Sequence, residues 1–146
     1  MVKPQLLQKY ALFGGLLEEQ IENIMPLMNE ESYNPEEYII SEGKANDKIF
    51  FLLEGHVAVT KKDVSLTHLG EGEAIGEMEV LDVMPAIASI KALSQVKAMS
   101  ISNKSLREIY KLDIKTFSLI IMNLARELSR RLRKMDEKMA DLPTSI

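Results

Sequence analysis

The spacing of apolar residues changes twice along the chain. From residue 4 to residue 31 they recur every three or four positions, the spacing of a helix, and "FGG" at Phe13–Gly15 divides this segment into two pieces. From Ser32 to about Ser102 they gather in short segments separated by turn-forming residues. From Asn103 onward the helical spacing returns. The pattern predicts N-terminal helices, a β domain and C-terminal helices.

The middle region contains six strand-like segments rich in Ile, Val, Phe and Tyr, from "EYIIS" to "VKAMSIS". Val57 and Val59 alternate before "KKD", as Val64 and Leu66 do after it, which predicts a hairpin with its tip at 61–63. Short strands with turns every eight to twelve residues indicate an antiparallel all-β architecture, not a parallel α/β sheet.

The C-terminal region predicts two helices. In "NKSLREIYKLD", Asn103 is a candidate N-cap for the first helix. The stretch from Ile114 to Leu142 contains neither Gly nor Pro and predicts one long helix. We therefore expect two units: residues 1–112 form the β unit with its N-terminal helices and a hinge helix, and residues 113–142 form the C-terminal helix.

Composition narrows the function. The chain is 46% apolar and 27% charged, as in an ordinary globular domain, and it has no apolar run long enough to cross a membrane and no signal-peptide core. We therefore expect a cytoplasmic protein without membrane contact. The absence of Cys excludes thiolate metal sites and cysteine nucleophiles, and no other metal site is indicated. A net charge of -4 disfavours a general nucleic-acid binder.

Several motifs carry weak chemical signals. The glycines of "GEGEAIG" could cradle a phosphate, but no βαβ unit surrounds them, and plain turns explain them better. Glu77 and Glu79 share a face of an extended chain and could form an acid/base pair, yet no cleft can be argued for them. The basic run "RELSRRLRK" indicates a solvated helix face more than a nucleic-acid contact. No enzyme activity is indicated.

The order of these segments resembles the cyclic nucleotide-binding domain family, which includes catabolite-activator-type regulators and the regulatory subunits of protein kinase A. The resemblance runs from Leu12 to about Lys134. It rests on four segments, "LFGGLLEEQIENI", "YIISEGKANDKIFFLLEGHVAV", "LGEGEAIGEMEVL" and "SLREIYKLD". It implies a mainly β fold with flanking helices: an eight-stranded antiparallel β-roll (jelly-roll) with N-terminal helices and a long C-terminal helix.

The resemblance also implies a ligand site, the phosphate-binding cassette, in "GEMEVLDVMPAIASI". In the family a Gly-Glu pair opens a short helix and the Glu carboxylate binds the ribose 2′-hydroxyl; a later Pro precedes an Arg that clamps the cyclic phosphate. Here Ala86 stands at the Arg position, and Ile87 stands where a small or hydroxylated residue is usual. Ile75 and Glu36 also depart from the family pattern. The candidate ligand-binding residues are Gly76, Glu77, Met78, Pro85, Ala86, Ile87 and Ser89.

The replacement of the phosphate-binding Arg by Ala86 separates two possible functions. Charge-assisted hydrogen bonds contribute roughly 1.5–3 kcal/mol each, so losing a bidentate Arg weakens binding by about two orders of magnitude or more. Lys91 lies an odd number of residues from Ala86 and is expected on the opposite face of a strand. We expect a regulatory module that lacks normal binding of cAMP or cGMP, although either could bind weakly. The alternative is a working sensor of a cyclic nucleotide or another small anion.

The long C-terminal helix carries an apolar stripe at spacings of three and four. Its proximal part can pack on the β unit, but the part from Leu124 onward needs another surface. The resemblance implies a parallel helix pair, so we expect a homodimer, or otherwise docking onto an unidentified effector protein. This chain ends at Ile146, so no DNA-binding domain is expected in it. The expected centre of the interface is Leu124, Leu128, Leu132 and Met135.

Overall fold

The computed structural model describes residues 2–142. Short helices open the chain: α1 (Pro4–Leu7), η1 (Ala11–Phe13), α2 (Glu18–Ile24) and η2 (Met25–Leu27). Six strands follow: β1 (Asn29–Tyr33), β2 (Tyr38–Ile40), β3 (Lys48–Glu54), β4 (Val57–Lys61), β5 (Val64–Leu69) and β6 (Ala74–Ile75). The remaining elements are α3 (Glu77–Asp82), β7 (Ser89–Ala92), β8 (Val96–Ser102), α4 (Asn103–Leu112) and α5 (Ile114–Ala140).

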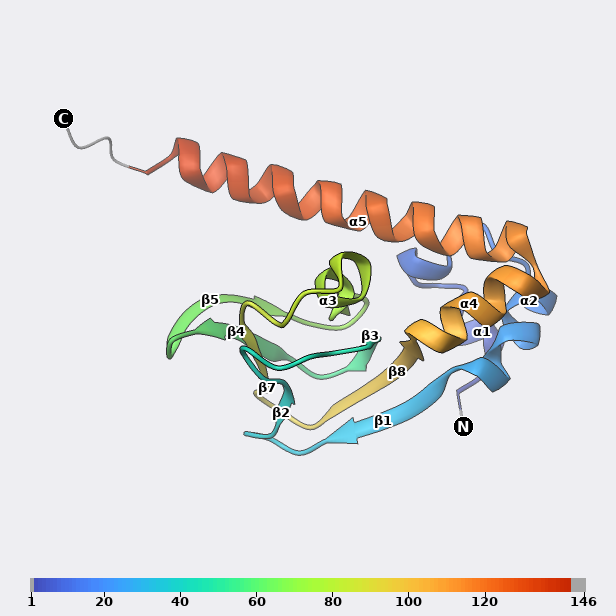
Figure 1. Cartoon of the computed structure of the whole chain (residues 1–146), viewed down its shortest axis with the longest axis horizontal. Helices are drawn as coiled ribbons and strands as arrows, with labels where there is room; N and C mark the ends of the chain where they lie inside the picture. Colours follow the sequence, from blue (N-terminus) through green and yellow to red (C-terminus); the bar gives the residue numbers. More distant parts are fainter. Residues whose placement is uncertain (1, 143–146) are drawn as a thin grey trace.

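The eight strands form two antiparallel four-stranded sheets, in the orders β1-β8-β3-β6 and β2-β7-β4-β5. The expected eight-stranded antiparallel roll with N-terminal helices and a long C-terminal helix is therefore confirmed. The helix α5 runs along one side of the roll, past α3, and the N-terminal helices lie beside its first turns (Figure 1). Among residues 2–142, no helix is both long and apolar enough to cross a membrane.

Strand β3 divides the core into two clusters. Ile49, Phe51 and Leu53 point to the side covered by the N-terminal helices, α4 and α5. Phe50 and Leu52 point between the two sheets. Because both faces of β3 are covered, its apolar residues form a continuous run in the sequence instead of alternating with polar ones.

The hairpin between β4 and β5 has its tip where the sequence predicts it. Lys62 and Asp63 both have positive φ, 50° and 64°. Two consecutive positive-φ residues form the turn whose twist matches that of the flanking strands. Asp tolerates this conformation better than most residues do.

Three predicted boundaries are wrong. The N-terminal helices end at Leu27, not at residue 31, because Pro26 lies in the last turn and residues 29–33 pair with β8. Within "GEGEAIG", Ala74 and Ile75 form β6 beside β3, where the sequence indicated only turns. The N-cap of α4 is Ser102, whose side chain accepts a hydrogen bond from the backbone of Ser105, and Asn103 is the first helical residue.

The helix α5 is held to its own chain by polar as well as apolar contacts. Asn123 is buried, and its Nδ2 donates to the carbonyl oxygens of Leu12 and Gly14 at 3.0 and 2.9 Å. Leu124 is 1% exposed in the first cluster. Leu124 therefore belongs to the core of its own chain, which corrects its expected place at the centre of a dimer interface.

These contacts predict the effect of Asn123→Ala. The change removes the donor of one buried and one partly buried carbonyl oxygen, so we expect the free energy of unfolding to fall by about 2 kcal/mol. Urea unfolding measures this difference. The neighbouring Met122 is half-exposed, so Met122→Ala is the control and should change stability by less than about 0.5 kcal/mol. Equal losses in the two variants would contradict an anchoring role for Asn123.

Candidate functional site

Gly76 sets the start of the cassette, between β6 and α3. Its φ is +82°, a conformation that L side chains rarely adopt. A Cβ at this position would lie 2.5 Å from the carbonyl oxygen of Lys48 and 2.7 Å from Nδ2 of Asn46. Both the backbone conformation and the close approach of these atoms therefore require glycine, and they aim Glu77 inward at the first turn of α3.

The end of α3 is strained. Val83 follows the helix with φ 57° and ψ 36°, although β-branched residues adopt this left-handed region least readily. Its side chain is 82% exposed, so packing of the side chain does not offset the backbone strain. Strain of this kind costs about 1–3 kcal/mol and is commonly found at functional segments. The loop that leads from α3 to β7 therefore has a shape imposed by the rest of the cassette.

Ala86 is built into the roll. Its side chain is 4% exposed and belongs to the cluster between the sheets. Its N–H donates to the carbonyl of Lys44 at 2.9 Å, and its carbonyl accepts from the N–H of Gly43 at 2.7 Å. The position at which the family resemblance implies a phosphate-clamping Arg is therefore occupied by a small core residue, with both backbone groups bonded inside the protein.

Glu77 is paired with a residue distant in the sequence. Its side chain is 7% exposed, and Oε1 accepts from Nη1 of Arg131 on α5 at 3.0 Å. Nη2 of Arg131 donates to the carbonyl of Ala74 and to Oε1 of Glu127 at 3.1 Å. The prediction of a solvated face for the basic run is therefore wrong for Arg131.

A spacing signal in the sequence could have revealed this pair. Residues that face the core of their own chain along α5 follow intervals of three and four, and the interval after Glu127 reaches Arg131. The resulting home face consists of Thr116, Ile120, Asn123, Glu127 and Arg131, and the first three are fully buried. Because four of these five residues are polar, hydrophobic periodicity alone did not detect this face.

The cluster around Arg131 carries excess negative charge. Burial raises the pKa of Glu77, the positive charge of Arg131 opposes that rise, and Glu127 and Glu79 add to it. Burial also raises the pKa of Glu79, against hydrogen bonding from Asn46. Two buried polar atoms of the pair, Oε2 of Glu77 and Nε of Arg131, have no hydrogen-bond partner. The arrangement leaves one acceptor and one donor without a partner.

The other predicted site residues do not converge on one point. The side chains of Met78, Pro85 and Ile87 are exposed. Ser89 uses its hydroxyl to accept the backbone N–H of Glu42 at 2.9 Å, which ties β7 to the loop after β2. Gly76 and Glu77 therefore lie at the start of α3, Ala86 lies in the cluster between the sheets, and Met78, Pro85 and Ile87 lie at the surface.

Two neighbouring lysines do not replace the missing clamp. Lys91 pairs with Glu36 and lies over the ring of Tyr38, at 5.8 Å from its centroid. Its side chain lies on the opposite face of β7 from the buried Ile90. This agrees with the face predicted from its spacing from Ala86. Lys44 accepts the Ala86 N–H through its carbonyl and is exposed. An exposed lysine in water contributes little to binding a charged group.

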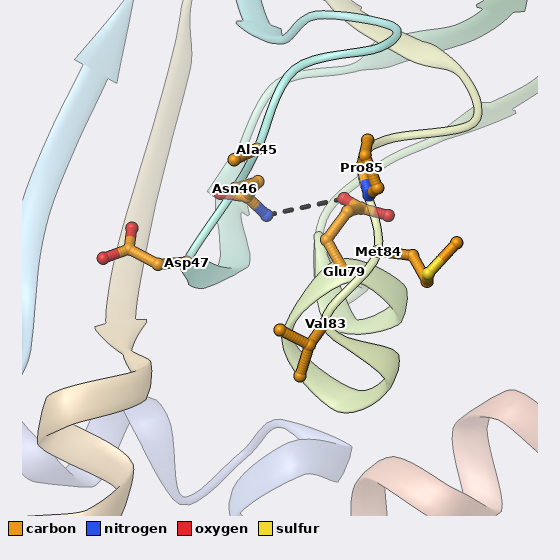
Figure 2. A pocket seen from close by; sticks show the side chains of 7 residues that line it. All are labelled: Ala45, Asn46, Asp47, Glu79, Val83, Met84 and Pro85. Carbon is orange, nitrogen blue, oxygen red and sulfur yellow. Dashed lines mark hydrogen bonds between the residues drawn. The ribbon is translucent and has the colours of Figure 1, made fainter.

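A hollow of about 430 Å³ lies beside the cassette, between residues 45–47 and the end of α3. Figure 2 shows the Glu79 carboxylate directed across it toward Asn46. Met84 and Pro85 lie on the same side of the hollow as Glu79. Nδ2 of Asn46 also donates to the carbonyls of Lys48 and Gly76. The hollow lies on the acidic side of the cassette, and it is lined by Ala45, Asn46, Asp47, Glu79, Val83, Met84 and Pro85.

The apolar stripe of α5 is separate from its home face. As far as Leu132, each stripe residue follows a home-face residue by one position, which places the stripe about 100° around the helix. Leu128 is half-buried, and the distal residues are each about 60% exposed or more: Leu132 60%, Met135 60%, Met139 66% and Leu142 63%. The distal stripe is therefore uncovered in the single chain.

Comparisons with known proteins agree on one family. A family model described as the cyclic nucleotide-binding domain matches residues 30–113. The fold is similar to that of a cyclic nucleotide-binding domain from Methylobacillus flagellatus KT, with 23% identity, a TM-score of 0.85, and coverage of 97% of this chain and 83% of that one.

Two bacterial regulators are also similar. The catabolite activator protein of Thermus thermophilus shares 25% identity at a TM-score of 0.75, and the match covers 89% of this chain but only 62% of that chain. The N-terminal domain of a transcriptional regulator from Streptomyces coelicolor A3(2) shares 27% identity at a TM-score of 0.71, with 96% and 97% of the two chains covered.

The burial of Glu77 predicts a pH-dependent stability. Because its folded-state pKa is raised, the folded state holds the proton more tightly than the unfolded chain does. The corresponding stability is present below the unfolded pKa and is lost as the pH rises through the folded pKa. Glu77→Gln removes this titration, so we expect the variant to gain stability relative to wild type as the pH rises from about 4 to 8.

Urea unfolding across that pH range measures the difference between the two proteins. Other carboxylates titrate in both proteins, so subtracting one curve from the other isolates Glu77. A difference that stays constant with pH, or one that favours the wild type at high pH, would contradict the prediction.

Proposed function

The chain belongs to the cyclic nucleotide-binding domain family, and from this premise we propose that its cassette does not bind cAMP or cGMP in the family's usual way. The fold supports a regulatory or sensor module, and the cyclic-nucleotide ligand of its relatives is chemically plausible for it. We propose that the chain is not an enzyme and that it acts on other molecules through a second copy of itself or through a partner protein.

The observation that carries the proposal is the burial of Ala86. A cyclic phosphate bears a full negative charge, and removing it from water without a paired cation is costly. At position 86 the cassette offers only a methyl group in the core, with its backbone N–H already donated to Lys44. Elsewhere in the cassette, the guanidinium of Arg131 is shared between the carboxylates of Glu77 and Glu127.

Homodimerisation through α5 is the second part of the proposal. The residues from Leu128 to Leu142 follow one another at intervals of four, three, four and three, which is a heptad pattern with two repeats. The preceding interval, from Leu124 to Leu128, is also four, so the pattern changes register there. That change lies where α5 leaves the hydrophobic core of its own chain. Leu124 remains buried in that core, whereas Leu128, Leu132 and Met135 form the proposed seam, which Met139 continues.

The cation at the start of the proposed seam is already bound within its own chain. With Leu132 and Met139 at heptad position a, Arg131 falls at position g and Asp136 at position e. Because Arg131 pairs with Glu77 and Glu127, it is not free to pair with Asp136 of a second copy, and the parallel arrangement rests on the family resemblance.

The proposed functional units keep the boundaries 1–112 and 113–142. Residues 114–124 of the second unit pack on the first, so the helix is continuous across the roll and the seam. An effector protein that binds the distal stripe in place of a second copy is the alternative partner. Oligomeric state distinguishes the two.

Calorimetry with cAMP and cGMP at millimolar concentration tests the ligand proposal. We expect affinity at least about 100-fold weaker than low-micromolar, and Ala86→Arg should raise it by at least about 10-fold. Ala86→Met is the control, because it adds a long side chain without charge and should give no gain. A low-micromolar dissociation constant for wild type would exclude the proposal. If the Ala86→Arg variant folds but gains no affinity for cyclic nucleotides, the burial of position 86 within the roll would explain why binding is lost.

Sedimentation equilibrium tests the dimer. At tens of micromolar we expect twice the chain mass for wild type. Leu132→Asp with Met135→Asp places charge in the seam without touching the core, so it should give a monomer with unchanged β-sheet circular dichroism. Arg133→Asp with Lys134→Asp alters charge outside the seam and should remain dimeric. If the wild type is a monomer, the dimer proposal is wrong and the stripe is left as a binding surface for a partner protein.

A further inference from the structure

A second hollow lies at the edge of the roll that is remote from the cassette. It has a volume of about 630 Å³ and lies between the N-terminal segment, α2, η2 and β1. β1 is one edge of its sheet and β6, which leads into the cassette, is the other edge, so β8 and β3 lie between the hollow and the cassette. The lining consists of Val2, Lys3, Pro4, Glu22, Met25, Pro26, Met28, Glu30 and Met99.

The hollow reaches the hydrophobic core. Met28 and Met99 line it and are 6% and 3% exposed, within the cluster on the side of the N-terminal helices. Met25 is partly buried against the same cluster. Three Met, two Pro and one Val make six of the nine lining residues apolar. A hollow of about 300–1,000 Å³ with a mostly apolar lining is typical of sites that bind small organic molecules.

The walls of the hollow are held in place by hydrogen bonds. The N–H of Val2 donates to Oε1 of Glu30 at 2.8 Å, which ties the N-terminal segment to β1. The carbonyl of Lys3 accepts from the N–H of Leu6 at 3.0 Å, at the start of α1. Pro26 restricts the backbone of η2 on the other side. The hollow is therefore largely formed before any ligand enters it.

The three methionines favour an aromatic ligand. The side chain of Met is unbranched and adapts its shape to the group beside it, and its sulfur packs favourably against the edge of an aromatic ring. Met25, Met28 and Met99 present three such sulfur-containing side chains to one hollow. We therefore expect an aromatic ring to bind here more tightly than an alkyl chain of similar size.

The charges at the hollow favour a cationic ligand. Glu30 lies directly opposite Met99 in the pairing of β1 with β8, so both side chains project from the same face of the sheet. Glu22 is a second carboxylate and Lys3 is the single cation, which gives the lining a net charge of -1. Within residues 2–142, neither carboxylate has an ion-pair partner. Exposed carboxylates contribute little affinity, so they select the sign of the ligand and the apolar floor supplies the binding.

We propose that this hollow binds a small aromatic amine, with its ring on the methionines and its ammonium group at Glu30 and Glu22. The site belongs to a different edge of the roll from the cassette. It therefore does not depend on whether the cassette binds a cyclic nucleotide.

NMR of protein labelled with ¹³C in the methionine methyl groups tests the inference, with 2-phenylethylamine as the probe. We expect the methyl signals of Met25, Met28 and Met99 to shift on titration, whereas those of Met135 and Met139 stay unchanged. The anion 3-phenylpropionate has a similar size and should bind about 5-fold or more weakly, because its charge is repelled. Hexylamine keeps the charge without the ring and should bind about 3-fold or more weakly.

Two double variants test the role of the carboxylates. Glu22→Gln with Glu30→Gln removes both charges from the hollow and keeps an acceptor for the N–H of Val2. It should weaken binding of 2-phenylethylamine by about 3-fold or more and abolish the preference over 3-phenylpropionate. Glu19→Gln with Glu37→Gln makes the same change in net charge outside the hollow and should change affinity by less than about 2-fold.

Four outcomes would overturn the inference. If 10 mM 2-phenylethylamine (about the weakest binding that matters) shifts none of the three methyl signals, the site does not exist. If the signals of Met78 or Met84 shift in their place, the amine binds beside the cassette. Equal affinity for the amine and the anion, or equal losses in the two double variants, would exclude recognition by Glu22 and Glu30. None of these outcomes would alter the proposal for the cassette.

Discussion

The ion pair between Arg131 and Glu77 joins the cassette to the C-terminal helix. It links residues 54 positions apart, one in the last half of α5 and the other in the first turn of α3. A pair this well buried requires additional hydrogen bonds, which the carbonyl of Ala74 and the carboxylate of Glu127 accept from Arg131. The pair fixes where α5 stops following the roll and begins to run free of it.

Sequence patterns predicted the parts of the fold that depend on local periodicity. The central strands and the long helix carry strong apolar spacing, and the hairpin tip carries turn residues. β1 and β6 escaped prediction because β1 is an edge strand of mixed polarity, "NEESY", and β6 contains only two residues. Both are strands because of the partners they pair with, β8 and β3, and a partner distant in the sequence leaves no local pattern.

The site was predictable in its frame and not in its contacts. The resemblance to the family identified Gly76, Glu77 and the missing Arg at position 86 from residue type alone. It could not identify Arg131, because four other cations in the same run are exposed and only the fold distinguishes one from the rest. Leu124 was misassigned for the same reason: it lies where the home face and the apolar stripe meet, and spacing fits both.

The two faces of α5 have different chemistry, and they place the Glu77–Arg131 pair of the cassette next to the uncovered distal stripe. The home face ends in polar contacts at Glu127 and Arg131, while the uncovered stripe continues through Leu132 and Met135. Polar contacts depend on direction and can be exchanged for those of a ligand, whereas apolar contacts tolerate small rotations. A group that competed for Arg131 would act on the helix one residue before the uncovered Leu132. If a ligand of the cassette changes the affinity of the stripe for a partner, linkage requires the partner to change the affinity of the cassette for that ligand by the same factor.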